Sequence, residues 1–350
     1  MSTPTPPLPA PLPIPADLIV AGSSAIIPLH AVPIGGGGYK LGLVVRAQDA
    51  QGNQSNDLLF ELDTGGQGFW MAPSGQIPTP ALEDCTLQIS YTSGIEYQAQ
   101  PVSLTLSFPE ANTPLAATAV VGLVGKVSGK YDQFPIFQKL YGDFGASLQA
   151  YTQQGQPQLL TVLAQLPAPY NTGFIVDIGP YPPTADQGVQ SPPRVIVGLT
   201  DALRQQFPNT VPMTAQPPYI SGPAAAPIAT FAETLIEAQL SVGGQTVPEP
   251  VAVVFDTGAA HTMIHKGNVV TPSYKPLVGD QIALVPSANP SFAVLNFTNS
   301  SPPSVAGWAT QGALNIPAGY INTGLNPFYS SPVMFDLANG LVRFPATVNF

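Results

Sequence analysis

Apolar and polar residues alternate with a period of two along much of this chain. Leu87, Ile89 and Tyr91 fall on one side of a short segment that ends in a Ser-Gly turn, and residues 102–106 repeat the pattern beyond it. Such alternation is typical of strands with one buried face. The two segments therefore predict a β-hairpin.

A second hairpin is predicted near residue 240. Ala238–Val242 is followed by Gly243-Gly244, and a pair of glycines supplies the positive φ angles that a tight turn needs. Helical spacing is rare and marks only Phe134–Leu148 and Asp201–Phe207 as candidate helices. Because Pro (42) and Gly (33) also interrupt the chain throughout, we expect an all-β fold with a few short helices.

Two apolar runs end in the same triplet. Leu58–Leu62 leads into Asp63-Thr64-Gly65, and Val251–Phe255 leads into Asp256-Thr257-Gly258. A single such triplet is typical of a turn that ends a strand. A carboxylate at the end of an apolar strand costs desolvation energy unless it is paired. The matched contexts indicate that the two acids pair with each other across two related halves.

The sequence around both triplets resembles the pepsin-like aspartic peptidases, and the likeness extends in order from about Tyr39 to Phe344. It is carried by Phe60–Trp70, Leu87–Gly94 (the family's flap hairpin), Val253–Gly258, Gly324–Phe328 and Val333–Phe344 (the family's closing strands). The resemblance implies a bilobal pepsin-like fold, mostly β, with the active site in the cleft between the lobes.

The same resemblance implies an aspartic endopeptidase that acts on a polypeptide substrate without cofactor or metal. Its implied site consists of the catalytic Asp63 and Asp256, the supporting Thr64, Thr257, Gly65 and Gly258, the flap residue Tyr91, and Trp70 behind it. The two acids would share a proton and activate a water molecule. The threonines would hydrogen-bond across the lobe interface, and the glycines would let backbone amides approach the acids.

Two positions depart from the family pattern. Gly66 and Ala259 stand directly after the triplets, where the family usually has Ser or Thr whose hydroxyl group bonds to the outer carboxylate oxygen. Losing a donor to the charged form should raise the pKa values of the pair, so we expect activity to extend toward neutral pH. Retroviral aspartic peptidases carry Ala there and are active. The alternative is a binding protein on the same fold with weak or no catalysis.

The family also braces each active-site loop with two hydrophobic residues and a glycine. In the first half Gly122, Gly179 and Gly198 each end a candidate element, and the sequence leaves the choice open. In the second half the corresponding place is Asn322-Thr323-Gly324, which is more polar than usual.

The domain organisation follows from the same reading. Residues 1–16 are Pro-rich and predict a flexible tail. We expect one lobe at 17–215 with the first acid and the flap, a linker at 216–229, and a second lobe at 230–350 with the second acid.

Composition narrows the function further. Charged residues make up 9% of the chain and the net charge is −10, with no Lys/Arg cluster, which argues against nucleic-acid binding. No apolar stretch is long enough to span a bilayer, and we expect a monomer. Cys85 is the single cysteine, so no intrachain disulfide can form. No signal peptide is recognised, and the compartment stays open. His261 and His265 lack a further ligand nearby, so no metal site is predicted.

Overall fold

Strands dominate the structure, a computed structural model that describes residues 14–183, 192–220, 226–232, 236–310, 316 and 318–348. Most of the tail predicted at residues 1–16 lies outside these ranges. Both predicted hairpins are present: Leu87–Ser90 pairs with Ile95–Ser107, and Ile236–Val242 turns back through Gly243-Gly244 onto Gln245–Thr246. The alternation of apolar and polar residues was sufficient to predict these strands, because each of them buries one face.

The first lobe is built on one sheet whose described strands run in the order β2-β3-β4-β9-β5-β8-β7-β6. These strands are β2 (His30–Gly35), β3 (Gly38–Gln48), β4 (Leu58–Asp63), β5 (Phe69–Met71), β6 (Leu87–Ser90), β7 (Ile95–Ser107), β8 (Ala116–Gly129) and β9 (Gly142–Gly145). The sheet places β4, which ends in the first triplet, between β3 and β9.

The second lobe repeats this plan. Its described strands run in the order β20-β19-β15-β17-β22-β18-β21, with β16 beside β15. They are β15 (Ile236–Val242), β16 (Gln245–Thr246), β17 (Val251–Val254), β18 (Thr262–His265), β19 (Gln281–Pro286), β20 (Leu295–Thr298), β21 (Ala306–Ala309) and β22 (Tyr320–Asn322). Here β17 leads into the second triplet and pairs in parallel with β22, as β4 pairs in parallel with β9.

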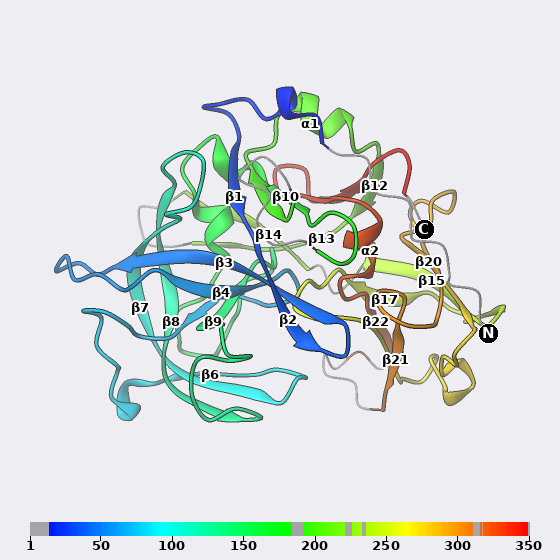
Figure 1. Cartoon of the computed structure of the whole chain (residues 1–350), viewed down its shortest axis with the longest axis horizontal. Coiled ribbons are helices and arrows are strands. Elements are labelled where there is room, and N and C mark those ends of the chain that lie inside the picture. Colours follow the sequence, from blue (N-terminus) through cyan, green and yellow to red (C-terminus); the bar gives the residue numbers. More distant parts are fainter. Residues whose placement is uncertain are drawn as a thin grey trace.

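A third sheet joins strands from the beginning, middle and end of the chain (Figure 1). Its described strands are β1 (Ala25–Pro28), β11 (Arg194–Val197), β10 (Phe174–Asp177), β23 (Val333–Asp336), β24 (Leu341–Phe344) and β12 (Asn209–Pro212), in that order. In Figure 1 the strands of the first lobe lie on one side of the molecule, those of the second lobe on the other, and β1, β10 and β12 lie at the top.

Helices are short in the described ranges. They are α1 (Asp201–Gln205), α2 (Asn326–Ser330) and the 3-10 turns Ala16–Leu18, Leu82–Asp84, Val162–Gln165, Tyr170–Thr172 and Pro272–Tyr274. The helix predicted over Asp201–Phe207 is present as α1, capped by the Thr200 hydroxyl, which accepts from the amide of Leu203 at 3.2 Å. In the described part of the chain, no helix is long and apolar enough to cross a membrane.

The prediction of the other helix is wrong. Phe134–Leu148 contains turns and the strand β9, which pairs with both β4 and β5. Gly142 and Gly145 explain the outcome. Gly142 has a φ of 141°, which a helix cannot accommodate, and both glycines pack against neighbouring backbone.

The proposed linker region, 216–229, overlaps two strands. Thr214–Tyr219 (β13) and Ile228–Ala232 (β14) pair with each other in an antiparallel ribbon. Residues 221–225 between them lie outside the described ranges. The lobe boundary at this point stays a prediction.

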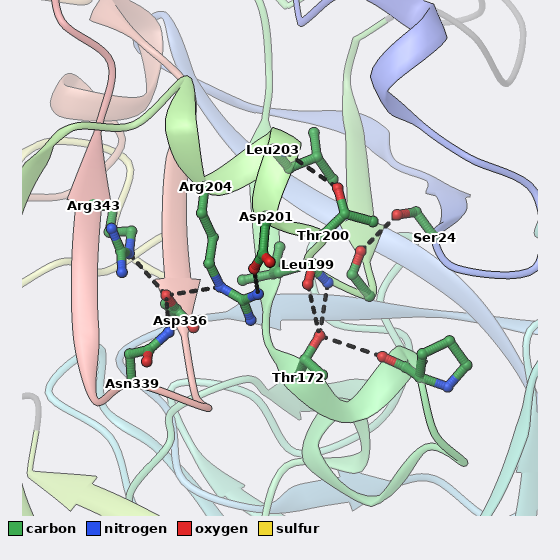
Figure 2. Close-up of polar contacts among 12 residues, drawn as sticks. Ser24, Thr172, Leu199, Thr200, Asp201, Leu203, Arg204, Asp336, Asn339 and Arg343 are labelled. Atoms are coloured by element: carbon green, nitrogen blue, oxygen red, sulfur yellow. Dashed lines mark hydrogen bonds and ion pairs between the residues drawn. The ribbon is translucent and has the colours of Figure 1, made fainter.

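A buried carboxylate holds α1 to the third sheet (Figure 2). Asp336, at the end of β23, is fully buried, and its Oδ2 accepts from Arg204 at 3.1 Å, from Arg343 at 2.8 Å and from Asn339 at 2.8 Å. Arg204 also reaches Asp201 at 3.2 Å. One acid near the end of the chain thereby ties together α1, β23 and β24.

Candidate active site

The two triplets face each other where the lobes meet. Asp63 ends β4 and Asp256 follows β17, and both are almost buried, at 9% and 8% exposure. The amide of Gly65 donates to Oδ1 of Asp63 at 2.8 Å, and that of Gly258 donates to Oδ1 of Asp256 at 2.6 Å. Each acid is thus oriented by the glycine of its own triplet.

Each glycine also makes room for the acid of the other triplet. A Cβ atom on Gly258 would lie 2.3 Å from Cγ of Asp63, and one on Gly65 would lie 2.7 Å from Cγ of Asp256. These distances are shorter than any side chain could tolerate. The glycines are required because the two carboxyl groups pack against the opposite loops.

The threonines lock the two loops together through four reciprocal hydrogen bonds. The amide of Thr64 donates to Oγ1 of Thr257 at 3.0 Å, and the amide of Thr257 donates to Oγ1 of Thr64 at 3.0 Å. Their hydroxyl groups donate to the carbonyls of Phe255 and Leu62, both at 2.6 Å. Both threonines are fully buried, so this network fixes the relative position of the two acids.

The strand that braces the first loop is β9, and this corrects the sequence-based candidates. Asp63 pairs with Gly145 at the end of β9, whereas Gly122 lies in β8, and Gly179 and Gly198 follow strands of the third sheet. A Cβ on Gly145 would lie 2.2 Å from the carbonyl oxygen of Gly68, so only glycine fits.

In the second lobe the predicted element is where it was expected, and it contributes a polar contact. The side-chain amide of Asn322, at the end of β22, donates to Oδ2 of Asp256. Oδ2 of Asp256 thus accepts a hydrogen bond from a side chain on a neighbouring strand. The sequence analysis noted the polar character of this element without assigning it a contact.

The two residues expected to form and support the flap, Tyr91 and Trp70, have different hydrogen-bond partners. Tyr91 follows β6, packs edge-to-face with Tyr97 at a centroid distance of 5.6 Å, and donates its hydroxyl to Oδ2 of Asp143. Trp70 belongs to the same apolar cluster, but its indole N–H donates to the carbonyl of Gln67 at 2.9 Å. The hydrogen-bond partner of the tyrosine is thus an acid that the sequence analysis missed.

A positively charged side chain, that of Lys40, also contacts the site. Lys40, on β3, contacts Glu61 at 2.5 Å and donates to the carbonyl of Gly258 in the second triplet. Burial would lower the pKa of Lys40, but the adjacent Glu61 carboxylate, with Asp63 and Asp256, outweighs this effect and raises the pKa. The lysine therefore stays charged and links the two lobes.

The electrostatics of Asp63 favour its protonated form. Burial, followed by the negative charges of Asp256 and Asp143, raises its pKa well above the ordinary value of 3.8. A hydrogen bond with Asp256 acts in the same direction.

No group of three or more His, Cys, Asp or Glu side chains in the described ranges is arranged to hold a metal ion.

Comparison with protein-family models finds no match, and comparison with curated protein sequences finds none either. Among solved structures, the chain is similar to the aspartic proteinase from Irpex lacteus, with a TM-score of 0.57 and 13% identity. The match covers 93% of this chain and 97% of that protein. The chain therefore has a bilobal aspartic protease fold, mostly β.

Proposed function

We propose that this protein is an aspartic endopeptidase whose catalytic groups are Asp63 and Asp256. The observation that carries the proposal is the pairing of two buried carboxyl groups, one from each lobe, by the reciprocal hydrogen bonds of Thr64 and Thr257. Folded chains rarely bury two acids side by side without a use for them.

The proposed reaction needs one proton shared by the two acids. The ionised member takes a proton from a water molecule held between the carboxyl groups, and the protonated member donates to the carbonyl oxygen of the substrate peptide bond. The water then attacks the carbonyl carbon. Burial and the charge of Asp256 raise the pKa of Asp63, which keeps the shared proton in place as the pH rises.

The substrate in this proposal is an extended polypeptide bound across the paired acids. Tyr91, on the hairpin formed by β6 and β7, would cover the substrate and exclude water, and Trp70 would support the flap through their shared apolar cluster. Closure of the flap over the acids strengthens electrostatic interactions within the site.

A second candidate is a binding protein on this fold without turnover. Gly66 and Ala259 favour it, because both lack the hydroxyl group that usually follows the triplet in the pepsin-like family. Asn322 weakens this alternative, since it supplies a donor to Asp256.

The deciding experiment incubates the purified protein with an unfolded polypeptide between about pH 3 and about pH 7, with and without pepstatin. We expect cleavage that extends toward neutral pH, is blocked by pepstatin and is abolished in Asp63→Asn. The exposed Asp132→Asn is the matched control and should cleave normally. No cleavage at any pH would refute the peptidase, and pepstatin binding without cleavage would favour the binding protein.

A further inference from the structure

A third carboxyl group, that of Asp143, lies buried beside the two triplets. Asp143 belongs to β9 and is 4% exposed. Its Oδ2 accepts the hydroxyl of Tyr91, whereas Oδ1 makes no hydrogen bond to any residue in the described ranges. The reaction proposed above requires two acids, so the third needs a separate explanation.

The position of Asp143 is equivalent to that of Asn322 in the other lobe. Each lies on the bracing strand, two residues before its glycine, and opposite the residue two places before the acid of its own lobe. Asn322 uses this position to donate to Asp256. The twofold relation of the lobes therefore directs the side chain of Asp143 toward Asp63.

Gly66 opens the space between these two acids. A Cβ on Gly66 would lie 2.9 Å from Oδ2 of Asp143 and 2.9 Å from Oδ2 of Asp63. The two oxygens thus border the same point and are separated by no more than twice that distance. A serine at position 66 would place its side chain into this gap. The absence of a hydroxyl after the first triplet and the presence of Asp143 are therefore two parts of one arrangement.

The surroundings of Asp143 favour its protonated form. The ionisable groups that act on it or on which it acts are Lys40, Glu61, Asp63, Tyr91, Tyr97 and Asp256. Burial, then the charge of Glu61, raise the pKa of Asp143 well above the ordinary value of 3.8, and the Tyr91 hydrogen bond and Lys40 offset this only in part. A protonated carboxyl group has an O–H to donate.

We propose that Asp143 is a positioning residue of this site: its carboxyl group takes the place of the hydroxyl missing after the first triplet and joins the flap residue Tyr91 to Asp63. The inference rests on the proposed function. In this arrangement Asp143 accepts from Tyr91 through one oxygen and, when protonated, serves Asp63 as a neutral donor. Closing of the flap and orientation of Asp63 are thereby coupled.

The test compares Asp143→Ala, Asp143→Asn, Tyr91→Phe and the double variant Asp143→Ala/Tyr91→Phe, with Asp132→Asn as the exposed control. Asp143→Ala should lower kcat on the order of tenfold, since small displacements of reacting groups are costly, and should weaken pepstatin binding. Asp143→Asn keeps an acceptor and a neutral donor. Its kcat and its affinity for pepstatin should therefore be close to those of the wild type. The effect of Asp143→Ala should shrink when Tyr91 is already Phe, because both changes break the same link.

Equal losses of kcat and pepstatin binding in Asp143→Ala and Asp143→Asn would overturn the proposal. So would a double variant whose loss equals the product of the losses in Asp143→Ala and Tyr91→Phe. If Asp143→Ala does not fold, the near-isosteric Asp143→Asn and Tyr91→Phe decide. Asp143→Asn must then keep wild-type pepstatin affinity while Tyr91→Phe weakens it.

A readout that needs neither cleavage nor inhibitor separates this inference from the proposed function. The side-chain carboxyl carbon of Asp143, assigned by its loss in Asp143→Asn, can be followed by 13C NMR against pH. We expect titration well above 3.8, moving higher still in Tyr91→Phe because a donor to the ionised form is lost. Titration at or below 3.8, or no response to Tyr91→Phe, would overturn the proposal even in an active enzyme.

Discussion

Single residues at the lobe interface have roles that local chemistry explains. Thr64 and Thr257 each fill the backbone hydrogen-bonding needs of the opposite loop, at a place that water does not reach. A β-branched residue without a hydroxyl would keep the shape and lose these bonds. The interface is therefore sensitive to the removal of one oxygen atom.

Thr257→Val should lower the free energy of unfolding by about 2 to 3 kcal/mol, because it leaves the amide of Thr64 and the carbonyl of Leu62 buried and unpaired. Urea unfolding measures the change. The exposed Thr79→Val makes the same chemical change on the surface and should cost less than about 0.5 kcal/mol. Similar losses of stability in both variants would contradict this role of the threonine hydrogen bonds.

The raised pKa of Asp63 predicts how the stability of the protein depends on pH. The folded state binds this proton more tightly than the unfolded state, so the associated stability is present below pH 3.8 and is lost as pH rises through the folded pKa. The Asp63→Asn variant has no proton to lose at this position, so its stability does not fall in this way as the pH rises. At pH 7 it should be more stable than the wild type by about 1 kcal/mol or more, with the gap closing at low pH. A gap that does not change with pH would refute this.

At the level of elements, β9 is the strand on which the first half of the site depends. It runs parallel to β4, pairs Gly145 with Asp63 and carries Asp143. The sequence analysis marked Phe134–Leu148, which includes this strand, as a candidate helix. These residues are placed by turns and by packing against other strands, contacts that no local pattern records.

Gly145→Ala tests the brace. Its Cβ would meet the carbonyl oxygens of Gly68 at 2.2 Å and Gly66 at 2.6 Å, which are backbone atoms that cannot move aside. We expect a loss of about 3 kcal/mol or more in unfolding experiments. Gly155→Ala has open space around it and a φ of 75°, so it should cost only about 1 kcal/mol. A mild effect at Gly145 would show that β9 does not hold the loop as described.

Across the whole molecule, the third sheet holds together segments that are far apart in sequence. Asp336 near the end of the chain binds Arg343 on β24 and Arg204 on α1 (Figure 2). Since Asp336 is fully buried, its charge must be matched by these partners.

Asp336→Asn should lower the free energy of unfolding by about 2 kcal/mol. This is less than for a fully enclosed pair, because Arg204 and Arg343 retain some exposure and can be hydrated. The matched control is Asp201→Asn, which removes an acid bound to the same Arg204 but 92% exposed. It should cost about 0.5 kcal/mol or less. Equal effects would mean that burial does not set the strength of this contact.

Some parts of the structure follow from local sequence. The hairpin at Gly243-Gly244 follows from turn chemistry, and α1 begins where Thr200 can cap it. The two acids stood out because each ends an apolar strand in the same short context. These features depend on residues within a few positions of one another, so a single sequence contains them.

What the sequence by itself determined, then, is the pair Asp63 and Asp256 with their own threonines and glycines, and the all-β class. Tertiary structure alone decided which other side chains contact them. Asp143 and Asn322 reach the site only because β9 and β22 pair in parallel with β4 and β17. Parallel pairing joins strands distant along the chain, and an Asp or Asn before a distant glycine has no local mark of its partner. The gap at Gly66 looks like a lost hydroxyl in the sequence, and in the fold it is the space beside a third acid.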